Sequence, residues 1–389
     1  MNRTIVEVHV VQTVPPSNVN RDDTGSPKTA VFGGVTRARV SSQAWKRATR
    51  VGFQESLDRE DLGVRTTRLV EQVSELITAM SPDNPEPDAV AEAIVGATGI
   101  KLEKKKRKKA GGIEEENVES KYLVFLSHQQ LALLARTAVE TYTDGGLAAV
   151  KAFKAKGLLR QANAVDIALF GRMVADDTDL NVDASCQVAH ALSVHAVDSE
   201  FDYFTAVDDV KREAEDEDAG ASMIDTVEFN SSTLYRYANI DVNLLRANLG
   251  DDEATRRAIS AFVGCFVMSM PTGKQNTFAN RTLPELVLVT IRDTQPINLV
   301  GAFEDPVVRT AKSPYSYTAA VRLLEQLAEV TEVHGQKPVE SWIIALGNAR
   351  RGWKDSEGRL DATGAVPVWT TLPDLPTQVA DSALSRILA

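Results

Sequence analysis

The alternation of apolar and polar side chains in the first part of the chain predicts a strand followed by a helix. Residues 4–14 alternate and are rich in Val, and Pro15 and Pro16 end this pattern. A polar, glycine-containing loop follows through residue 34. Ser41 and Ser42 are suited to begin the helix, because a serine hydroxyl accepts the unpaired N–H groups of a first turn.

Helical spacing then dominates the chain from about residue 60 to residue 180. The segments that carry it are 69–80, 89–95, 122–142 and 147–174. The basic run 101–109, followed by two glycines, interrupts the spacing and is expected to be a flexible loop. We interpret the whole stretch as a helical insertion.

The second half of the chain completes a mixed α/β (α+β) pattern. The sequence predicts strands at 225–230, 233–245 and 285–292, and helices at 253–269, 319–333 and 376–388. Without the insertion the order is strand–helix–strand–strand–helix–strand. This order is the split βαβ, or ferredoxin-like, arrangement, which RNA-recognition domains also use.

The net charge of −11 hides an uneven distribution of charges. Residues 198–220 hold ten acidic and two basic side chains, whereas residues 21–50 hold seven basic and two acidic ones. The run 101–109 adds seven basic residues and one Glu. Such blocks indicate separate basic surfaces and make a polyanion a candidate partner.

The composition excludes several classes of protein. With 43% hydrophobic and 25% charged residues, the chain can bury a core without disulfides. Cys186 and Cys265 are the only cysteines, which excludes a disulfide framework and a cysteine-rich zinc module. No segment has the pattern of a secretory signal or of a membrane span, so we expect a cytoplasmic protein.

The strongest local signal is a basic helix face that begins near Ser41. Gln43, Lys46, Arg47 and Arg50 share one face of the predicted helix, without an acidic residue four positions further on. The opposite face, which can be buried, consists of Ala44, Trp45, Ala48 and Val51. Cations beside the N–H groups of a helix start suit phosphates. The alternative is an ordinary solvated face.

Other segments could support binding of nucleic acid. Arg21 and Lys28 precede the helix, and Lys274 lies in a later loop that lacks the full spacing of a P-loop. Phe201, Tyr203 and Phe204, beside the acidic segment, suit stacking on bases or docking on a partner; a small satellite core explains them equally well.

A basic patch and two candidate metal sites lie further along. Lys151, Lys154, Lys156 and Arg160 could touch a nucleic-acid backbone or simply be a solvated helix face. Asp176, Asp177, Asp179 and Asp183 have no EF-hand spacing, so a polar loop is the simpler interpretation. Cys186, His190 and His195 favour core histidines over a metal site.

The order of several short motifs resembles a known family. These motifs are NRDD at 20–23, FGG at 32–34, RVSSQ at 39–43, VDIALFGRM at 165–173, AHAL at 189–192, FTAVDD at 204–209, YRYANI at 235–240 and GKQ at 273–275. They span most of residues 1–290 and resemble the backbone subunit of the type I-E CRISPR Cascade complex, the CasC family.

The resemblance implies a hand-shaped protein. Its RRM-like, ferredoxin-like palm would consist of residues 1–58, 184–197 and 231–389. Residues 59–183 would form helical fingers, and residues 198–230 a β-hairpin thumb. Copies would assemble along CRISPR guide RNA, with the thumb of one copy displacing a base held by its neighbour.

The resemblance also implies roles for individual residues. Contacts with the guide RNA would come from Arg21, Lys28, Ser41, Ser42, Gln43, Lys46, Arg47, Arg50, Arg172, Lys274 and Gln275. Met173 and Phe204 would act as wedges at the kinked nucleotide, and Lys151, Lys154 and Lys156 would contact target DNA. The implied partners are guide RNA, target DNA, further copies of the chain and other Cascade subunits, with no membrane, metal or other cofactor.

The function we expect is therefore a non-enzymatic, sequence-independent scaffold for a guide RNA. One alternative is a metal-dependent ribonuclease, in which Asp22, Asp23 or the cluster at 176–183 would activate water. A second alternative is an acidic adaptor that binds only proteins.

Overall fold

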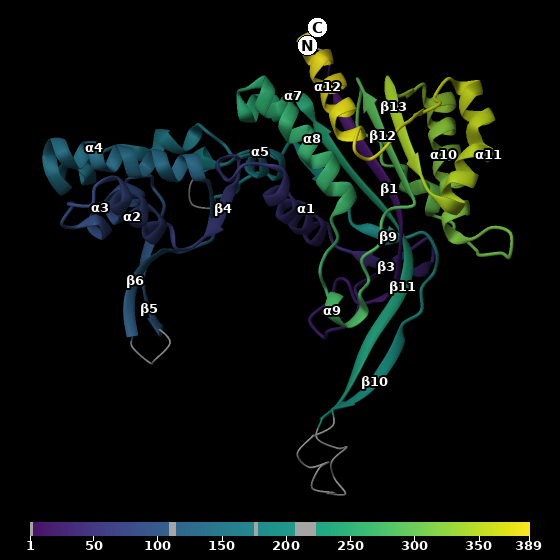
Figure 1. The fold of residues 1–389 in the computed structure, drawn as a ribbon, viewed down its shortest axis with the longest axis horizontal. Coiled ribbons are helices and arrows are strands. Elements are labelled where there is room, and N and C mark those ends of the chain that lie inside the picture. Colours follow the sequence, from purple (N-terminus) through teal and green to yellow (C-terminus); the bar gives the residue numbers. More distant parts are fainter. Residues whose placement is uncertain (1–2, 109–113, 175–177, 207–222) are drawn as a thin grey trace, which may run out of the picture. The chain divides into compact units, whose positions relative to one another are not determined.

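The chain divides into two compact units in the computed structural model, which describes residues 3–108, 114–174, 178–206 and 223–389 (Figure 1). The first unit comprises Met1–Gly52, Gln187–Asp241 and Ile259–Ala389. The second comprises Phe53–Cys186 and Val242–Ala258. The sequence assigns all of 231–389 to the palm. In the structure, Val242–Ala258 instead belongs to the same unit as the inserted segment.

The first unit is built on a sheet whose central strands follow the ferredoxin-like order. Strands β12 (Leu286–Arg292), β1 (Ile5–Ser17), β11 (Met223–Asp241) and β9 (Ala191–Ser193) are neighbours in that order, and each pair is antiparallel. The sheet extends beyond β12 through β13 (Glu340–Ala345) and β14 (Val368–Trp369), and beyond β9 through β3 (Val35–Val40) and β2 (Thr29–Phe32). The predicted fold class is confirmed.

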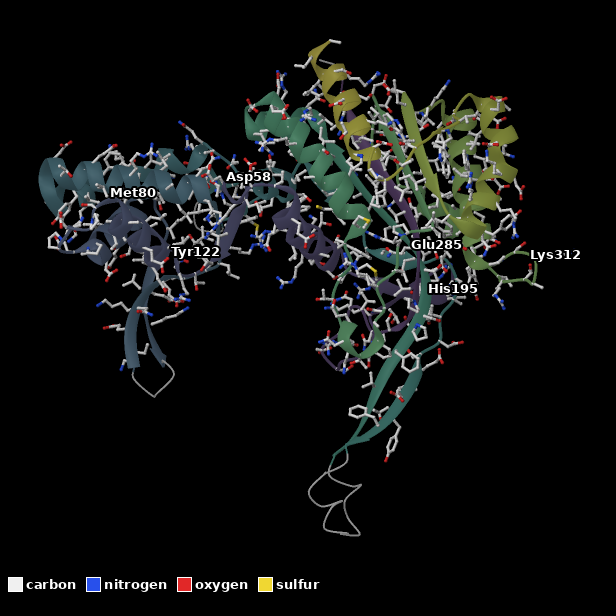
Figure 2. The ribbon with its side chains drawn as sticks, viewed as in Figure 1. Asp58, Met80, Tyr122, His195, Glu285 and Lys312 are labelled. Carbon is white, nitrogen blue, oxygen red and sulfur yellow. The ribbon has the colours of Figure 1, made fainter. Side chains whose placement is uncertain are left out.

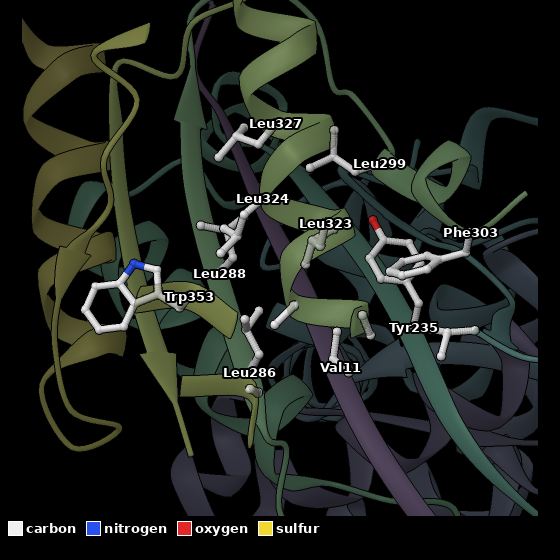
Figure 3. Close-up of a cluster of buried hydrophobic side chains, with 14 of the residues drawn as sticks. Val11, Tyr235, Leu286, Leu288, Leu299, Phe303, Leu323, Leu324, Leu327 and Trp353 are labelled. Atoms are coloured by element: carbon white, nitrogen blue, oxygen red, sulfur yellow. The ribbon is translucent and has the colours of Figure 1, made fainter. Parts of the chain in front are cut away.

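Helices cover both faces of this sheet, because alternate residues of its strands are apolar on both sides. On one face, α10 (Tyr315–His334) and α11 (Gly347–Thr363) bury Leu323, Leu324 and Trp353 against Val11 and Tyr235 (Figure 3). The opposite face of the sheet receives α1 (Ser42–Ser56) and α8 (Asp252–Met268).

A buried cation joins the helices of this second face to the sheet. Arg236 of β11 lies 3.8 Å from the ring centre of Trp45 in α1 and 4.7 Å from that of Phe266 in α8. It donates a hydrogen bond to Gln12 Oε1 at 2.6 Å. The Trp45 side of α1 is thereby fixed, which leaves the basic side for other contacts. Val51, expected to be buried, is 51% exposed.

Strand β11 differs most from the predicted strands. The segments 225–230 and 233–245 form one strand, whose later part pairs with β1 and whose first part pairs with β10 (Glu200–Ala206). The pairing with β1 is irregular between Val14 and Ser17, at the two prolines that were expected to end the first strand. The β10–β11 ribbon is the described part of the predicted thumb; residues 207–220 of the acidic segment lie outside the described residues.

The second unit has a helical core. Helices α2 (Leu69–Met80), α3 (Pro87–Ala97) and α4 (His128–Ala152) bury Val73, Ile94 and Leu134 against one another. Strands β4 (Gly63–Thr66) and β7 (Val124–Ser127) form a two-stranded sheet beside them.

The basic run at 101–109 was wrongly expected to be a flexible loop. Residues up to 108 form strand β5 (Leu102–Lys108), which pairs with β6 (Glu114–Ser120); Lys109 lies outside the described residues. Lys105 Nζ lies 3.0 Å from Glu103 Oε1 and 3.8 Å from Glu119 Oε2, so acidic neighbours offset the basic charge.

The remaining elements are short or peripheral. They are η1 (Arg59–Asp61), η2 (Ala155–Arg160), α5 (Val165–Phe170), η3 (Thr178–Leu180), β8 (Cys186–Val188), α7 (Val242–Leu249), α9 (Gln275–Phe278), η4 (Leu299–Phe303) and α12 (Leu375–Leu388). Within the described ranges, we find no helix with the length and apolar character that a membrane crossing requires.

Candidate nucleic-acid interface

The loop that carries Arg21 is held in shape by its own polar groups. Asn18 Nδ2 donates hydrogen bonds to the carbonyls of Gly25 and Glu228, each at 2.9 Å. The Asp22 carboxylate accepts from the Thr24 hydroxyl and from the N–H groups of Thr24 and Ser26. The hydrogen bond from the Thr24 hydroxyl is the main reason why the pKa of Asp22 is lowered. This carboxylate therefore stabilises the loop, a role that does not favour the ribonuclease alternative.

The loop that carries Lys274 packs directly on the Arg21 loop. A Cβ added at Gly273 would lie only 2.2 Å from the carbonyl oxygen of Val19, so only glycine permits this approach. Lys274 follows in a left-handed conformation, with φ 50° and ψ 22°. The backbone contact thus sets Lys274 beside the Arg21 loop, although about 250 residues separate them in sequence.

The same contact borders a polar hollow of about 540 Å³, formed by residues 19–25 and Gly273. Phe278 in α9, just after Lys274, has its ring centre 5.6 Å from that of Phe229 in β11. Backbone contact and aromatic packing therefore both support the position of the Lys274 loop.

The start of α1 is tied to the Arg21 loop. Asn20 Oδ1 accepts a hydrogen bond from the Ser41 N–H at 2.9 Å, and Ser41 Oγ accepts one from Ala44 N at 3.3 Å. The Ser41 hydroxyl is therefore already used as a helix cap. Of the helix residues expected to contact RNA, Gln43 and Arg47 are exposed, while Ser42, Lys46 and Arg50 are partly buried.

Arg39, which contacts His190, extends this basic surface. Arg39 on β3 donates from Nε to the Thr29 carbonyl, and its Nη1 lies 3.2 Å from Nδ1 of His190. Burial is the main cause that lowers the pKa of His190, and the charges of Arg39 and Lys28 lower it further. The sequence had listed Arg39 only within a motif, because its approach to His190 depends on the pairing of β3 with β9.

His195 is a core histidine, as the sequence favoured. Its Nδ1 donates to the carbonyl of Ala196 at 2.8 Å, and its Nε2 accepts from Thr233 N at 3.1 Å. Its ring stacks on that of Tyr315 with the ring centres 3.9 Å apart. Both ring nitrogens are therefore used by the protein itself.

The β10–β11 ribbon exposes aromatic rings. Phe201 and Tyr203 lie on one face of β10, and Phe204, opposite Asp225 of β11, lies on the other. All three side chains are exposed, so the alternative of a satellite core is wrong. Exposed rings on a two-stranded ribbon are available to stack on bases or to contact a partner.

Arg172 in the second unit contradicts the expectation that its side chain contacts RNA. The residue is only 5% exposed, and its guanidinium donates to the carbonyls of Leu180, Phe125 and Leu159 and to Gln130 Oε1. Burial lowers the pKa of Arg172 to about 10, which leaves it charged at neutral pH. These bonds fix the backbone that presents Met173, whose side chain is 85% exposed.

The lysines expected to contact DNA have different surroundings. Lys151 and Lys154 are exposed, whereas Lys156 Nζ lies 2.9 Å from Asp179 Oδ2. Arg160 pairs with the same carboxylate at 3.2 Å. The hydrogen bond from Lys156 is the main reason why the pKa of Asp179 is lowered, and the charges of Lys156 and Arg160 lower it further.

Asp179 is thus an ion-pair partner in the structure. Asp176 and Asp177 of the proposed aspartate cluster lie outside the described residues. Across the part of the chain that the structure describes, no group of three or more His, Cys, Asp or Glu residues is arranged to hold a metal ion.

Both the sequence and the fold of the chain are similar to those of known proteins. The model of a family described as "CT1975-like protein" matches residues 6–364. No curated protein sequence matches the chain. A solved chain of a "CRISPR RNA-guided surveillance complex, pre-nicking" is similar to it, with a TM-score of 0.80 and 32% identity over 97% of this chain and 100% of that chain. A chain of another "CRISPR RNA-guided surveillance complex" has a TM-score of 0.69 and 27% identity over 98% and 99% of the two chains.

Proposed function

The chain belongs to the CT1975-like protein family, and from this we propose that it is the guide-RNA-binding backbone subunit of a CRISPR Cascade surveillance complex. The two similar solved chains, both from RNA-guided surveillance complexes, support this function over nearly the whole length of the chain. Its partners are then guide RNA, target DNA, further copies of itself and other Cascade subunits, in the cytoplasm. We assign it no catalytic role.

One observation carries the proposal: the first unit gathers cations from loops that are distant in sequence. The Gly273–Val19 contact and the Asn20–Ser41 hydrogen bond bring together the Lys274 loop, the Arg21 loop and the start of α1. The proposed contacts with the guide backbone come from Arg21, Lys28, Ser42, Gln43, Lys46, Arg47, Arg50, Lys274 and Gln275, joined by Arg39. Lysine and arginine bind phosphates without reading bases, as a scaffold for many guides requires.

The exposed side chains outside this surface fit the same function. Phe204 on the ribbon and Met173 in the second unit would act as wedges beside unstacked bases, since every base offers a π-face and stacking is tolerant of sequence. Lys151 and Lys154, with Lys156 beside Asp179, would contact the backbone of target DNA.

RNA binding by the purified chain at two salt concentrations tests the proposal. Wild type should bind RNAs of different sequence with similar affinity and with a strong dependence on salt. Lys46→Ala/Arg50→Ala should bind weakly and should lower the slope of log K against log salt by about 1.4, which corresponds to two contacts with a single strand.

A double variant with the same change in charge serves as the control. Lys337→Ala/Arg359→Ala removes two cations of the first unit that lie outside the proposed surface, and it should bind as wild type does. If Lys46→Ala/Arg50→Ala is folded and binds equally well, the basic face of α1 is merely solvated and the proposed site is wrong.

A further inference from the structure

A second basic surface lies on the opposite face of the sheet in the first unit, away from α1. It consists of Arg350, Arg351 and Lys354 in α11, with Tyr317 in α10 and Trp369 in β14 beside them. Lys312, in the loop that precedes α10, borders it (Figure 2). We call these six residues the α11 surface. The guide-binding surface proposed above uses none of them.

Aromatic rings brace both arginines of this surface. The guanidinium carbon of Arg350 lies 4.9 Å from the ring centre of Trp369, and that of Arg351 lies 4.5 Å from the ring centre of Tyr317. Trp369 in turn stacks on the buried Trp353, with ring centres 4.9 Å apart and planes at 14°. Stacking restricts the planar guanidinium groups while leaving their edges in water, which prepares them for bidentate contact with phosphate.

The electrostatics of α11 favour an anion at this place. Arg350 and Arg351 lie in the first turns of a helix of 17 residues, whose first turn has no acidic residue. Cations here oppose the positive end of the helix dipole, and Arg350 and Lys354 are like charges four positions apart. Lys354 has Glu357 as a partner at 2.9 Å, but no acidic side chain of the described residues forms an ion pair with Arg350 or Arg351. Asp355, which accepts a hydrogen bond from the Tyr317 hydroxyl at 2.8 Å, offsets part of this charge, and a bound anion would offset the rest.

The mixture of chemical groups identifies the kind of anion. Trp369 is 41% exposed and its neighbour Val368 is 63% exposed, so apolar surface lies directly beside the arginines. Phosphates spaced along a chain, with sugars and bases between them, match alternating cationic and aromatic groups. A single inorganic anion would use the arginines and leave the apolar groups in water.

We propose that the α11 surface binds the phosphodiester backbone of a single nucleic-acid strand other than the guide. This inference rests on the proposed function, in which pairing of a guide with one strand of DNA leaves the other strand unpaired. That unpaired DNA strand is the occupant we assign to the α11 surface. The contact is independent of sequence, because arginine forks meet phosphates and not base edges.

The experiment uses the assembly purified with its guide RNA and a fluorescent single-stranded DNA that cannot pair with the guide. Fluorescence anisotropy should show salt-dependent binding to the wild-type assembly. Arg350→Ala/Arg351→Ala should weaken that binding by about tenfold or more. Arg350→Lys/Arg351→Lys, which keeps the charge but loses the forks and the stacking, should fall between the two. The Lys variant also tests the proposal if the Ala variant fails to fold.

Lys337→Ala/Arg359→Ala is again the matched control, because Arg359 lies in the same helix and pairs with Glu329 at 3.5 Å. It should leave DNA binding unchanged. Equal binding by wild type and by both Arg350/Arg351 variants would overturn the proposal. So would a variant that binds DNA normally but no longer joins the assembly, since the surface would then contact an acidic protein.

The ratio of RNA to protein in each preparation separates this inference from the proposed function. If the wild-type assembly holds no guide RNA, the proposed function itself is wrong. If guide RNA is present in wild type and lost in Arg350→Ala/Arg351→Ala, the α11 surface belongs to the guide and the assignment to a second strand is overturned. A guide content equal to wild type, together with weaker DNA binding, supports the inference.

Discussion

A single methyl group at Gly273 should disable one side of the proposed guide-binding surface. In Gly273→Ala, the new Cβ would lie 2.2 Å from Val19 O, 2.6 Å from Val19 C and 2.8 Å from Asn18 O. Carbon contacts normally begin near 3.5 Å, so the loops must separate by about 1 Å. All three obstructing atoms belong to the backbone, and no side chain can rotate away to make room. Lys274 then moves away from the Arg21 loop.

The expected loss follows from the contact with a phosphate that we propose for Lys274. A hydrogen bond to a charged group contributes about 1.5 kcal/mol or more, so Gly273→Ala should raise the dissociation constant for RNA by roughly tenfold. Lys274→Ala should cause a similar loss. The double variant should be no weaker than either single variant, because both changes remove the same contact.

Fluorescence anisotropy with a labelled RNA at two salt concentrations measures these changes. Gly358→Ala is the matched control, since a Cβ at that helical glycine meets no atom within 4 Å. It should bind RNA as wild type does and be slightly more stable. The reasoning is refuted if Gly273→Ala binds RNA with unchanged affinity and salt dependence. Losses that add up in the double variant would show that Gly273 does not act through Lys274.

Three further predictions concern the interior of the two units. Glu7 is fully buried and accepts hydrogen bonds from Arg292 Nε at 2.5 Å and Thr290 Oγ1 at 2.7 Å. Glu7→Gln would leave the buried Arg292 cation unpaired. It should therefore lower the free energy of unfolding, measured by urea titration, by about 3–5 kcal/mol. Burial lowers the pKa of His9 from 6.5 to about 4. As the pH falls, His9 is therefore protonated in the unfolded chain before it is protonated in the folded one. The stability present above pH 6.5 should fall by about 3 kcal/mol as the pH drops to 4, and His9→Gln should reduce this dependence of stability on pH. Arg172→Leu should destabilise the second unit by more than about 2 kcal/mol, whereas Met173→Ala should change stability by less than about 0.5 kcal/mol; equal thermal shifts would contradict the distinction between these neighbours.

Strong periodicity explains which elements could be predicted from the sequence. The bounds of α2 were predicted correctly, and β1, α8, β12, α10 and α12 were placed to within a few residues, because each has a clear apolar face. Helix α11 was missed because 17 residues supply only Ala349, Trp353 and Leu360 as buried hydrophobic side chains. Strand β5 was missed because its residues are mostly charged and its pairing with β6, as between Lys105 and Glu119, joins segments whose contact the local pattern does not show.

Strand β11 was divided in two because its centre is polar. Asn230, Ser232 and Thr233 are buried, although side chains of these polar types are mostly exposed in proteins. Thr233 finds a partner that is distant in sequence, because its Oγ1 lies 3.0 Å from Thr13 Oγ1. Such partners exist only after the sheet has formed, so no local pattern could reveal them.

The candidate site could be predicted where a single element carries it. The basic face of α1 follows from helical spacing, and the sequence placed Gln43, Lys46, Arg47 and Arg50 together. The burial of Arg172 and the pairing of Arg39 with His190 depend on how distant segments pack, and single-sequence patterns contain no such information. The sequence shows which residues are arginines, but only the structure shows which of them are accessible to a ligand.

Because β11 is continuous, it fixes the distance between the central sheet and the aromatic rings of the ribbon. One strand of 19 residues, about 60 Å when extended, is shared by the central sheet and the ribbon. Its pairing with β1, from Ile5 opposite Asp241 to Val14 opposite Ser232, therefore also fixes how far each aromatic ring of the ribbon lies from the sheet. A slip of one residue would turn buried side chains outward and reverse the faces of the ribbon together. Insertions and deletions in this strand should accordingly be rejected during evolution.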